Sequence, residues 1–109
     1  MAKKKGLETE RHHIFGTVTG VSHTVTPTGT GYAVIVRVSL NPAAGESVYT
    51  VLPFPFATGI NSAGNEIAPP IPLTLLSGNI YTGSGNLTER PVHVRVTAKF
   101  LSAAIQVSD

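Results

Sequence analysis

Cysteine and tryptophan are both absent from this sequence of 109 residues. Without cysteine the chain can form no disulfide bond, no thiolate zinc site and no cysteine nucleophile. Charge is also scarce, since charged residues make up 13% of the chain and hydrophobic residues 41%. This balance excludes an intrinsically disordered protein, which needs high charge and low hydrophobicity. The length suits one domain with a single core.

Long hydrophobic runs are lacking as well. Proline, glycine or arginine interrupts every apolar stretch before the ~20 residues that a membrane helix needs. The basic start, Lys3-Lys4-Lys5, precedes Gly6-Leu7-Glu8 and no apolar segment, so we expect no secretory signal. A cytoplasmic protein without a membrane partner is the expectation, with residues 1–11 as a basic, flexible arm ahead of a single domain, 12–109.

The residues that are abundant favour β-structure. Threonine (13) and valine (12) are the commonest residues, followed by 11 glycines, and there are 8 prolines. Side chains branched at Cβ suit a pleated surface, while glycine and proline favour turns. No window of about a dozen residues has the apolar period of a helix. The composition therefore predicts an all-β domain.

Alternating apolar and polar residues predict five strands, at 13–25, 32–40, 46–52, 91–100 and 101–107. Turns are expected at 26–31 and 41–45. Gly16 and Gly20 lie on one face of the first strand and predict a bend or bulge there. Residues 53–89 are predicted to form an irregular insertion rich in proline and glycine, with a flexible loop at 83–86. Residues 73–81 fit either a short strand or one helical turn.

A three-stranded meander, an insertion and two closing strands follow the strand order of a small Greek-key barrel. With its long first strand punctuated by Gly16 and Gly20, the chain resembles the OB-fold single-stranded-DNA-binding proteins of the primosomal and the phage or plasmid helix-destabilising type. The resemblance implies a five- to six-stranded barrel that binds single-stranded DNA, or RNA, without catalysis. A β-sandwich is the alternative fold.

Catalytic and metal-binding patterns are missing from the sequence. The acidic residues are expected in turns, loops and termini, where no two share a strand face: Glu8, Glu10, Glu46, Glu66, Glu89 and Asp109. No nucleophile elbow or phosphate-binding loop occurs. His12 and His13 point to opposite sides of a strand, and His23 and His93 are interpreted as surface residues. We expect no enzyme, cofactor or metal.

Basic side chains within strands are the best candidate site. His93, Arg95, Thr97 and Lys99 share one face of a predicted strand and no acidic residue interrupts them. Phosphates need such cations, and single strands add stacking on aromatic rings. The candidate phosphate contacts are Arg37, Arg90, Arg95 and Lys99. The candidate stacking residues are Tyr32, Tyr49 and Tyr81. The alternative for these cations is an ordinary solvated sheet face.

Two functions follow from these residues. The first is a single-stranded nucleic-acid-binding protein that acts as a homo-oligomer. The second is a structural or assembly subunit of a virion, tail or filament, which would place the protein in a virion. For the segment Pro53-Phe54-Pro55-Phe56, either the rings fill the barrel or they dock onto another subunit. A sugar- or protein-binding module is a third use of the same fold.

Overall fold

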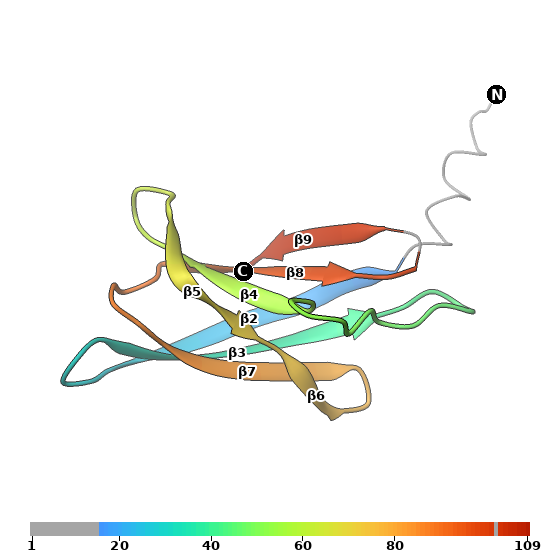
Figure 1. Ribbon diagram of the computed structural model, residues 1–109, viewed down its shortest axis with the longest axis horizontal. Helices are drawn as coiled ribbons and strands as arrows, with labels where there is room; N and C mark the ends of the chain where they lie inside the picture. Colours follow the sequence, from blue (N-terminus) through green and yellow to red (C-terminus); the bar gives the residue numbers. More distant parts are fainter. Residues whose placement is uncertain (1–15, 102) are drawn as a thin grey trace.

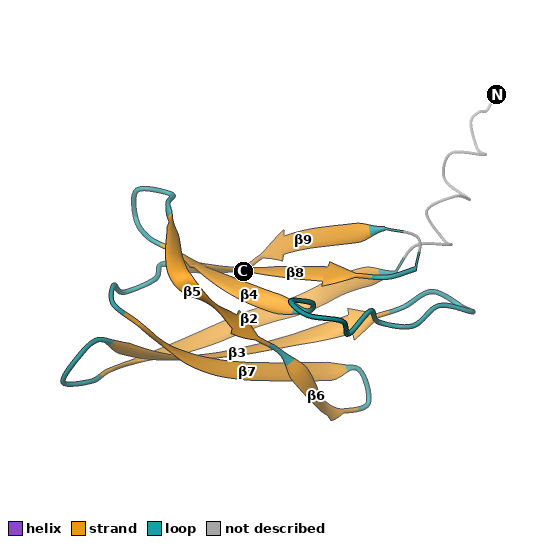
Figure 2. Cartoon of the chain, viewed as in Figure 1, coloured by secondary structure: helices purple, strands orange, loops and turns teal. Residues whose placement is uncertain are grey.

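The computed structural model describes residues 16–101 and 103–109, and this part of the chain consists of strands and loops (Figure 1, Figure 2). Two antiparallel four-stranded sheets pack against each other. The first sheet has the order β2 (Thr17–Pro27), β3 (Tyr32–Asn41), β7 (Ile80–Leu87) and β6 (Thr74–Ser77). The second has the order β5 (Glu66–Pro72), β4 (Phe56–Ile60), β8 (His93–Lys99) and β9 (Ala104–Ser108).

The all-β prediction is confirmed, but the sheets do not close into a barrel. A closed barrel needs strands that belong to both sheets, and along its described residues β2 pairs only with β3. The architecture agrees with the β-sandwich alternative and not with the expected OB-like barrel. The predicted arm, 1–11, and residues 12–15 lie outside the described residues.

Alternation along β3 and β8 supplies the core between the sheets. Val34, Val36 and Val38 on β3 are fully buried, while the residues between them face outward. Val94, Val96 and Ala98 on β8 are equally buried from the other sheet, and the ring of Phe100 closes one end. Each buried valine contributes roughly 1.5–3 kcal/mol relative to an exposed one. The predicted strands at 32–40 and 91–100 are thereby confirmed, with their faces.

A bulge in β2 keeps that strand on the core. Gly20 has a φ of 64°, which residues with a side chain rarely adopt, and the pairing with β3 shifts between Thr19 and Ser22. Because of this shift Val18 and Val21, three residues apart, both pack against the core. The bulge predicted from the glycines is confirmed at Gly20.

The strand predicted at 46–52 is wrong. Only Val48 makes an isolated bridge, with Phe100, and the Tyr49 N–H donates to the Lys99 carbonyl at 2.8 Å. The reason lies in the sheet, since β4 occupies one side of β8 from His93 to Thr97 and β9 occupies the other from Arg95 to Lys99. Residues 46–52 can therefore reach only the end of β8.

The irregular insertion predicted at 53–89 is also wrong, because these residues form β4, β5, β6 and β7. Three prolines, Pro69, Pro70 and Pro72, lie in β5. Proline cannot donate a ladder hydrogen bond, yet it is tolerated in a strand at the edge of a sheet, and β5 is such an edge. The prolines exclude a helix here without excluding a strand.

Gly83 and Gly85, predicted as part of a flexible loop, lie instead in β7 between β3 and β6. A Cβ at position 83 would overlap the carbonyl oxygen of Pro72, and one at position 85 would lie 3.1 Å from Ile71. The two glycines let β5 cross close over β7. From there the chain passes through the buried Leu73 into β6, in the other sheet (Figure 1). Residues 73–81 thus hold β6 and the start of β7.

We expect Gly83→Ala to lower the free energy of unfolding by about 3 kcal/mol, because a backbone atom of β5 cannot move aside for a methyl group as a side chain can. Gly29→Ala is the matched control, since nothing lies within 4 Å of its Cβ, and it should change stability by less than about 0.5 kcal/mol. Urea unfolding of both variants makes the measurement. Equal stabilities would contradict the close crossing.

Candidate functional site

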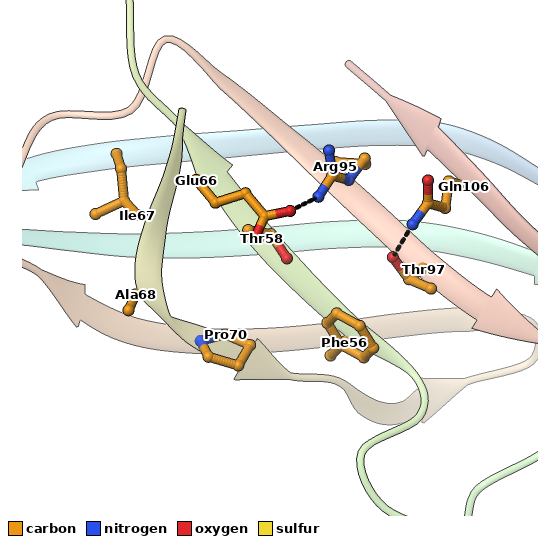
Figure 3. A pocket seen from close by; sticks show the side chains of 9 residues that line it. All are labelled: Phe56, Thr58, Glu66, Ile67, Ala68, Pro70, Arg95, Thr97 and Gln106. Atoms are coloured by element: carbon orange, nitrogen blue, oxygen red, sulfur yellow. Dashed lines mark hydrogen bonds and ion pairs between the residues drawn. The ribbon is translucent and has the colours of Figure 1, made fainter. Parts of the chain in front are cut away.

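The outer face of the second sheet holds a hollow of about 350 Å³ (Figure 3). Four strands contribute to it: β4 and β8 form the floor, β5 one wall and β9 the other. We call it the sheet-face hollow. Its lining residues are Phe56, Thr58, Glu66, Ile67, Ala68, Pro70, Arg95, Thr97 and Gln106.

Short side chains on the two central strands create this hollow. Thr58 on β4 and Thr97 on β8 are both 6% exposed and lie between the longer side chains of Phe56, Arg95 and Gln106. The wall on β5 rises because the pairing between β5 and β4 shifts register. Positions 57 and 59 on β4 are two residues apart, but their partners on β5, positions 71 and 67, are four residues apart. The extra residues arch away from the plane of the sheet.

The charge in the hollow is balanced. The Arg95 guanidinium forms an ion pair with the Glu66 carboxylate through Nη2, and the Glu66 side chain is 64% exposed. Arg95 Nε is buried and has no hydrogen-bond partner among the described residues. Gln106 Nε2 donates to Thr97 Oγ1 at 3.4 Å. The expectation of unopposed cations on this face is therefore wrong for Arg95, because pairing of β5 with β4 brings Glu66 opposite it.

Lys99 continues the same face beyond the hollow and lies against aromatic rings. Its Nζ is 4.8 Å from the centre of the Tyr49 ring and 5.8 Å from that of Phe54. Tyr49 and Phe54 meet edge to face at 6.0 Å, and Phe54 lies 5.7 Å from Phe56. Phe54 and Phe56 are half-buried on the outer face and lie outside the buried core cluster. The rings therefore do not fill the interior.

The other predicted residues lie elsewhere. Arg37 is exposed on the outer face of the first sheet. Arg90, in the loop between β7 and β8, lies 6.0 Å from the ring of Tyr32. Tyr81 is only 8% exposed, because it faces inward from β7, so its ring is closed to a base. Of the seven candidates, three share one surface: Tyr49, Arg95 and Lys99.

A second surface, which we call the apolar end, lies beside the aromatic rings. It consists of Leu52, Pro53, Phe54 and Leu75, with Leu52 85% exposed, and the exposed Val51 precedes Leu52 in the chain. A groove of about 340 Å³ opens between these residues and the buried Leu73 and Tyr81. Val51 and Leu52 belong to the strand expected at 46–52, so this surface is not predicted from the sequence. The signal in the sequence that could have indicated an exposed apolar surface is the pair Val51-Leu52 directly before the proline-rich turn that starts at Pro53.

His23 has a structural partner. Its Nδ1 contacts the Asp109 carboxylate, which also accepts a hydrogen bond from the Val94 N–H at 2.8 Å. This pair joins β2 to the second sheet. Within residues 16–101 and 103–109, no three histidine, aspartate or glutamate side chains gather in a way that could hold a metal ion. No helix in the described part of the chain is long and apolar enough to cross a membrane.

Comparison with models of known protein families gives no match, nor do the curated proteins and the solved structures contain one. No matching protein therefore supports the resemblance to OB-fold proteins. The surfaces that could carry a function are the sheet-face hollow, Lys99 with the rings of Tyr49 and Phe54, and the apolar end.

We expect a coupling energy of about 0.5–1 kcal/mol between Lys99→Met and Tyr49→Leu in a double-mutant cycle of unfolding free energies, because a cation over an aromatic ring is worth about that much at a half-exposed site. The control cycle pairs Lys99→Met with Tyr32→Leu, whose ring lies against Arg90 instead. Additive effects in both cycles would show that Lys99 does not hold the segment around Tyr49.

Proposed function

We propose that the protein is a non-catalytic assembly subunit that binds a second copy of itself through the apolar end. The observation that supports this is the concentration of exposed leucine and proline around one groove, Leu52, Leu75, Pro53 and Pro72. Contiguous apolar patches of this kind are rare on soluble monomers and generally mark contact surfaces.

The shape of the apolar end suits a copy of itself. Leu52 and Leu75 both line the groove, and the side chain of Leu52 is 85% exposed. A two-fold contact would let Leu52 of each copy enter the groove of its partner, so that both Leu52 side chains and both grooves are used.

The edge strand β6 adds backbone to this contact. Its four residues, Thr74–Ser77, are all exposed and carry no charge. Edge strands that must stay unpaired usually carry lysine or proline, as β5 does with its three prolines. Antiparallel pairing of β6, which contains Leu75, with β6 of a second copy would extend the first sheet across the two-fold axis.

The charge of the described residues favours self-association over phosphate binding. Residues 16–101 and 103–109 contain four basic and four acidic side chains: Arg37, Arg90, Arg95, Lys99, Glu46, Glu66, Glu89 and Asp109. Two copies of a neutral domain meet without net repulsion. The formal charge of +2 comes from residues 1–15.

We expect Leu52→Asp to convert the protein from a dimer or larger species to a monomer, because each interface would bury an unpaired carboxylate twice. Size-exclusion chromatography with light scattering measures this. Val92→Asp is the matched control, since Val92 is 48% exposed and lies beyond the Ile60 end of β4, away from the apolar end. It should leave the mass unchanged.

A monomeric parent protein at all accessible concentrations would contradict the proposal. So would a Leu52→Asp variant that keeps the mass of the parent.

A second candidate function is binding of single-stranded nucleic acid. One arrangement favours it: Lys99 and Arg95 lie on the same strand face, and Tyr49 offers an exposed ring beside Lys99. Cation and ring together are what a phosphate and its base require. Glu66 beside Arg95 weakens the field there, and for that reason we place this function second.

If this second function holds, Arg95→Ala with Lys99→Ala will lower affinity for labelled oligo-dT and flatten its salt dependence by ~0.7 per lost phosphate contact. Fluorescence anisotropy at low and moderate salt measures both effects. Arg37→Ala is the control, because Arg37 lies on the other sheet. An absence of binding at low salt, where charges are least screened, would exclude this function.

A further inference from the structure

The sheet-face hollow is not used by self-association at the apolar end. We propose that it binds a neutral saccharide, with room for one or two pyranose rings. A volume of about 350 Å³ lies at the low end of the ~300–1,000 Å³ typical of small-ligand sites. The residues that line the hollow are not those of the proposed dimer contact, and binding there does not require that contact.

The polar groups around the hollow match the hydroxyl groups of a sugar. Each sugar hydroxyl both donates and accepts, and it therefore needs mixed partners. Thr58 and Thr97 offer hydroxyls of the same kind on the floor, and the Gln106 amide offers both an acceptor and donors on one side. Glu66 adds carboxylate acceptors on the other side. Donors and acceptors therefore alternate around the space.

Arg95 has one donor, the buried Nε, without a hydrogen-bond partner among the described residues. Its guanidinium carries five N–H groups in a planar fork, and Glu66 is paired through Nη2. A planar fork can donate to two neighbouring oxygens at once, and adjacent hydroxyl groups on a sugar ring lie close enough together to accept from it. The contact with Glu66 holds the fork in place before a ligand arrives (Figure 3).

The apolar part of the lining suits the C–H faces of a pyranose. The ring of Phe56 stands at one end of the hollow, and Pro70 and Ala68 form the arched wall on β5 (Figure 3). Such flat apolar surfaces exclude water while the rim groups hold the hydroxyls. Phe56 is kept in this position by its contact with Phe54 at 5.7 Å.

The balanced charge selects a neutral ligand. The hollow contains one basic and one acidic side chain, and they are paired with each other. A phosphate or carboxylate would meet the Glu66 carboxylate beside Arg95, and an ammonium group would meet Arg95. A neutral polyhydroxylated ligand gains from both partners without separating them.

The test is a titration of the ¹⁵N-labelled full chain with neutral sugars, followed by two-dimensional NMR. The probes are glucose, galactose, mannose, N-acetylglucosamine and their disaccharides, up to millimolar concentration. We expect one or more to shift the backbone amides of Thr58 and Thr97 and the side-chain amide of Gln106. Raising the salt concentration should leave the affinity unchanged, because no ionic contact is made or lost.

Two variants test the assignment of contacts. Gln106→Ala, at an exposed position, should weaken binding about tenfold, the effect of one hydrogen bond of ordinary strength. Phe56→Leu should weaken it by a similar factor while keeping an apolar side chain in place. Ser84→Ala, on the other sheet, is the control and should bind as the parent does.

Three results would overturn the proposal. The first is an absence of shifts with every neutral sugar tested. The second is binding only of acidic sugars or oligonucleotides, with an affinity that falls as salt rises. The third is binding that neither Gln106→Ala nor Phe56→Leu weakens. Because the chain carries Leu52 unchanged in all these experiments, their outcome is separate from that of the self-association test.

Discussion

The close crossing of β5 over β7 is the constraint on which the rest of this sandwich depends. The carbonyl of Pro72 lies where a side chain at Gly83 would be, so the two strands approach at a distance that only glycine permits. At that crossing the chain leaves the second sheet and enters the first as β6. The continuous chain from β5 through Leu73 to β6 thus connects the two sheets along one side. On the other side the contact between His23 and Asp109 connects them.

Both candidate surfaces follow from the path of this strand. Before the crossing, β5 arches over extra residues and forms the wall of the sheet-face hollow. After the crossing, β6 swings clear of the second sheet and leaves Leu75 uncovered at the apolar end. A straight β5 paired evenly with β4 would have neither the wall nor the opening. The surfaces are therefore consequences of one irregularity, in a segment rich in proline.

The sequence predicted those parts of the fold that local alternation determines. Valine at every second position identified β3 and β8 with their buried faces, and Gly20 identified the bulge. Prediction from the sequence failed where the neighbouring strands decide whether a segment forms a strand. The density of proline and glycine at 53–89 predicts an irregular insertion, although at the edge of a sheet the N–H that proline lacks would face no neighbouring strand.

In the candidate site, too, local alternation could be predicted from the sequence and contacts between strands could not. The face that carries Arg95, Thr97 and Lys99 could be predicted from alternation. The ion pair with Glu66 could not, because it depends on the register of β5 against β4. Tyr81 looked available for stacking, but its inward position on β7 depends on which strands flank it.

The two surfaces meet at the segment 53–56, and this adjacency would link the proposed self-association to the proposed ligand binding. Phe54 borders the groove of the apolar end, and its neighbour Phe56 lines the hollow. A smaller cleft between Leu52, Pro53, Phe56, Pro70 and Pro72 lies between them. A partner seated on Phe54 would hold the ring of Phe56 against the hollow and so reduce the ordering that a ligand must impose. A dimer would also present two hollows in fixed relation, which raises the avidity for a repeating saccharide without any new contact.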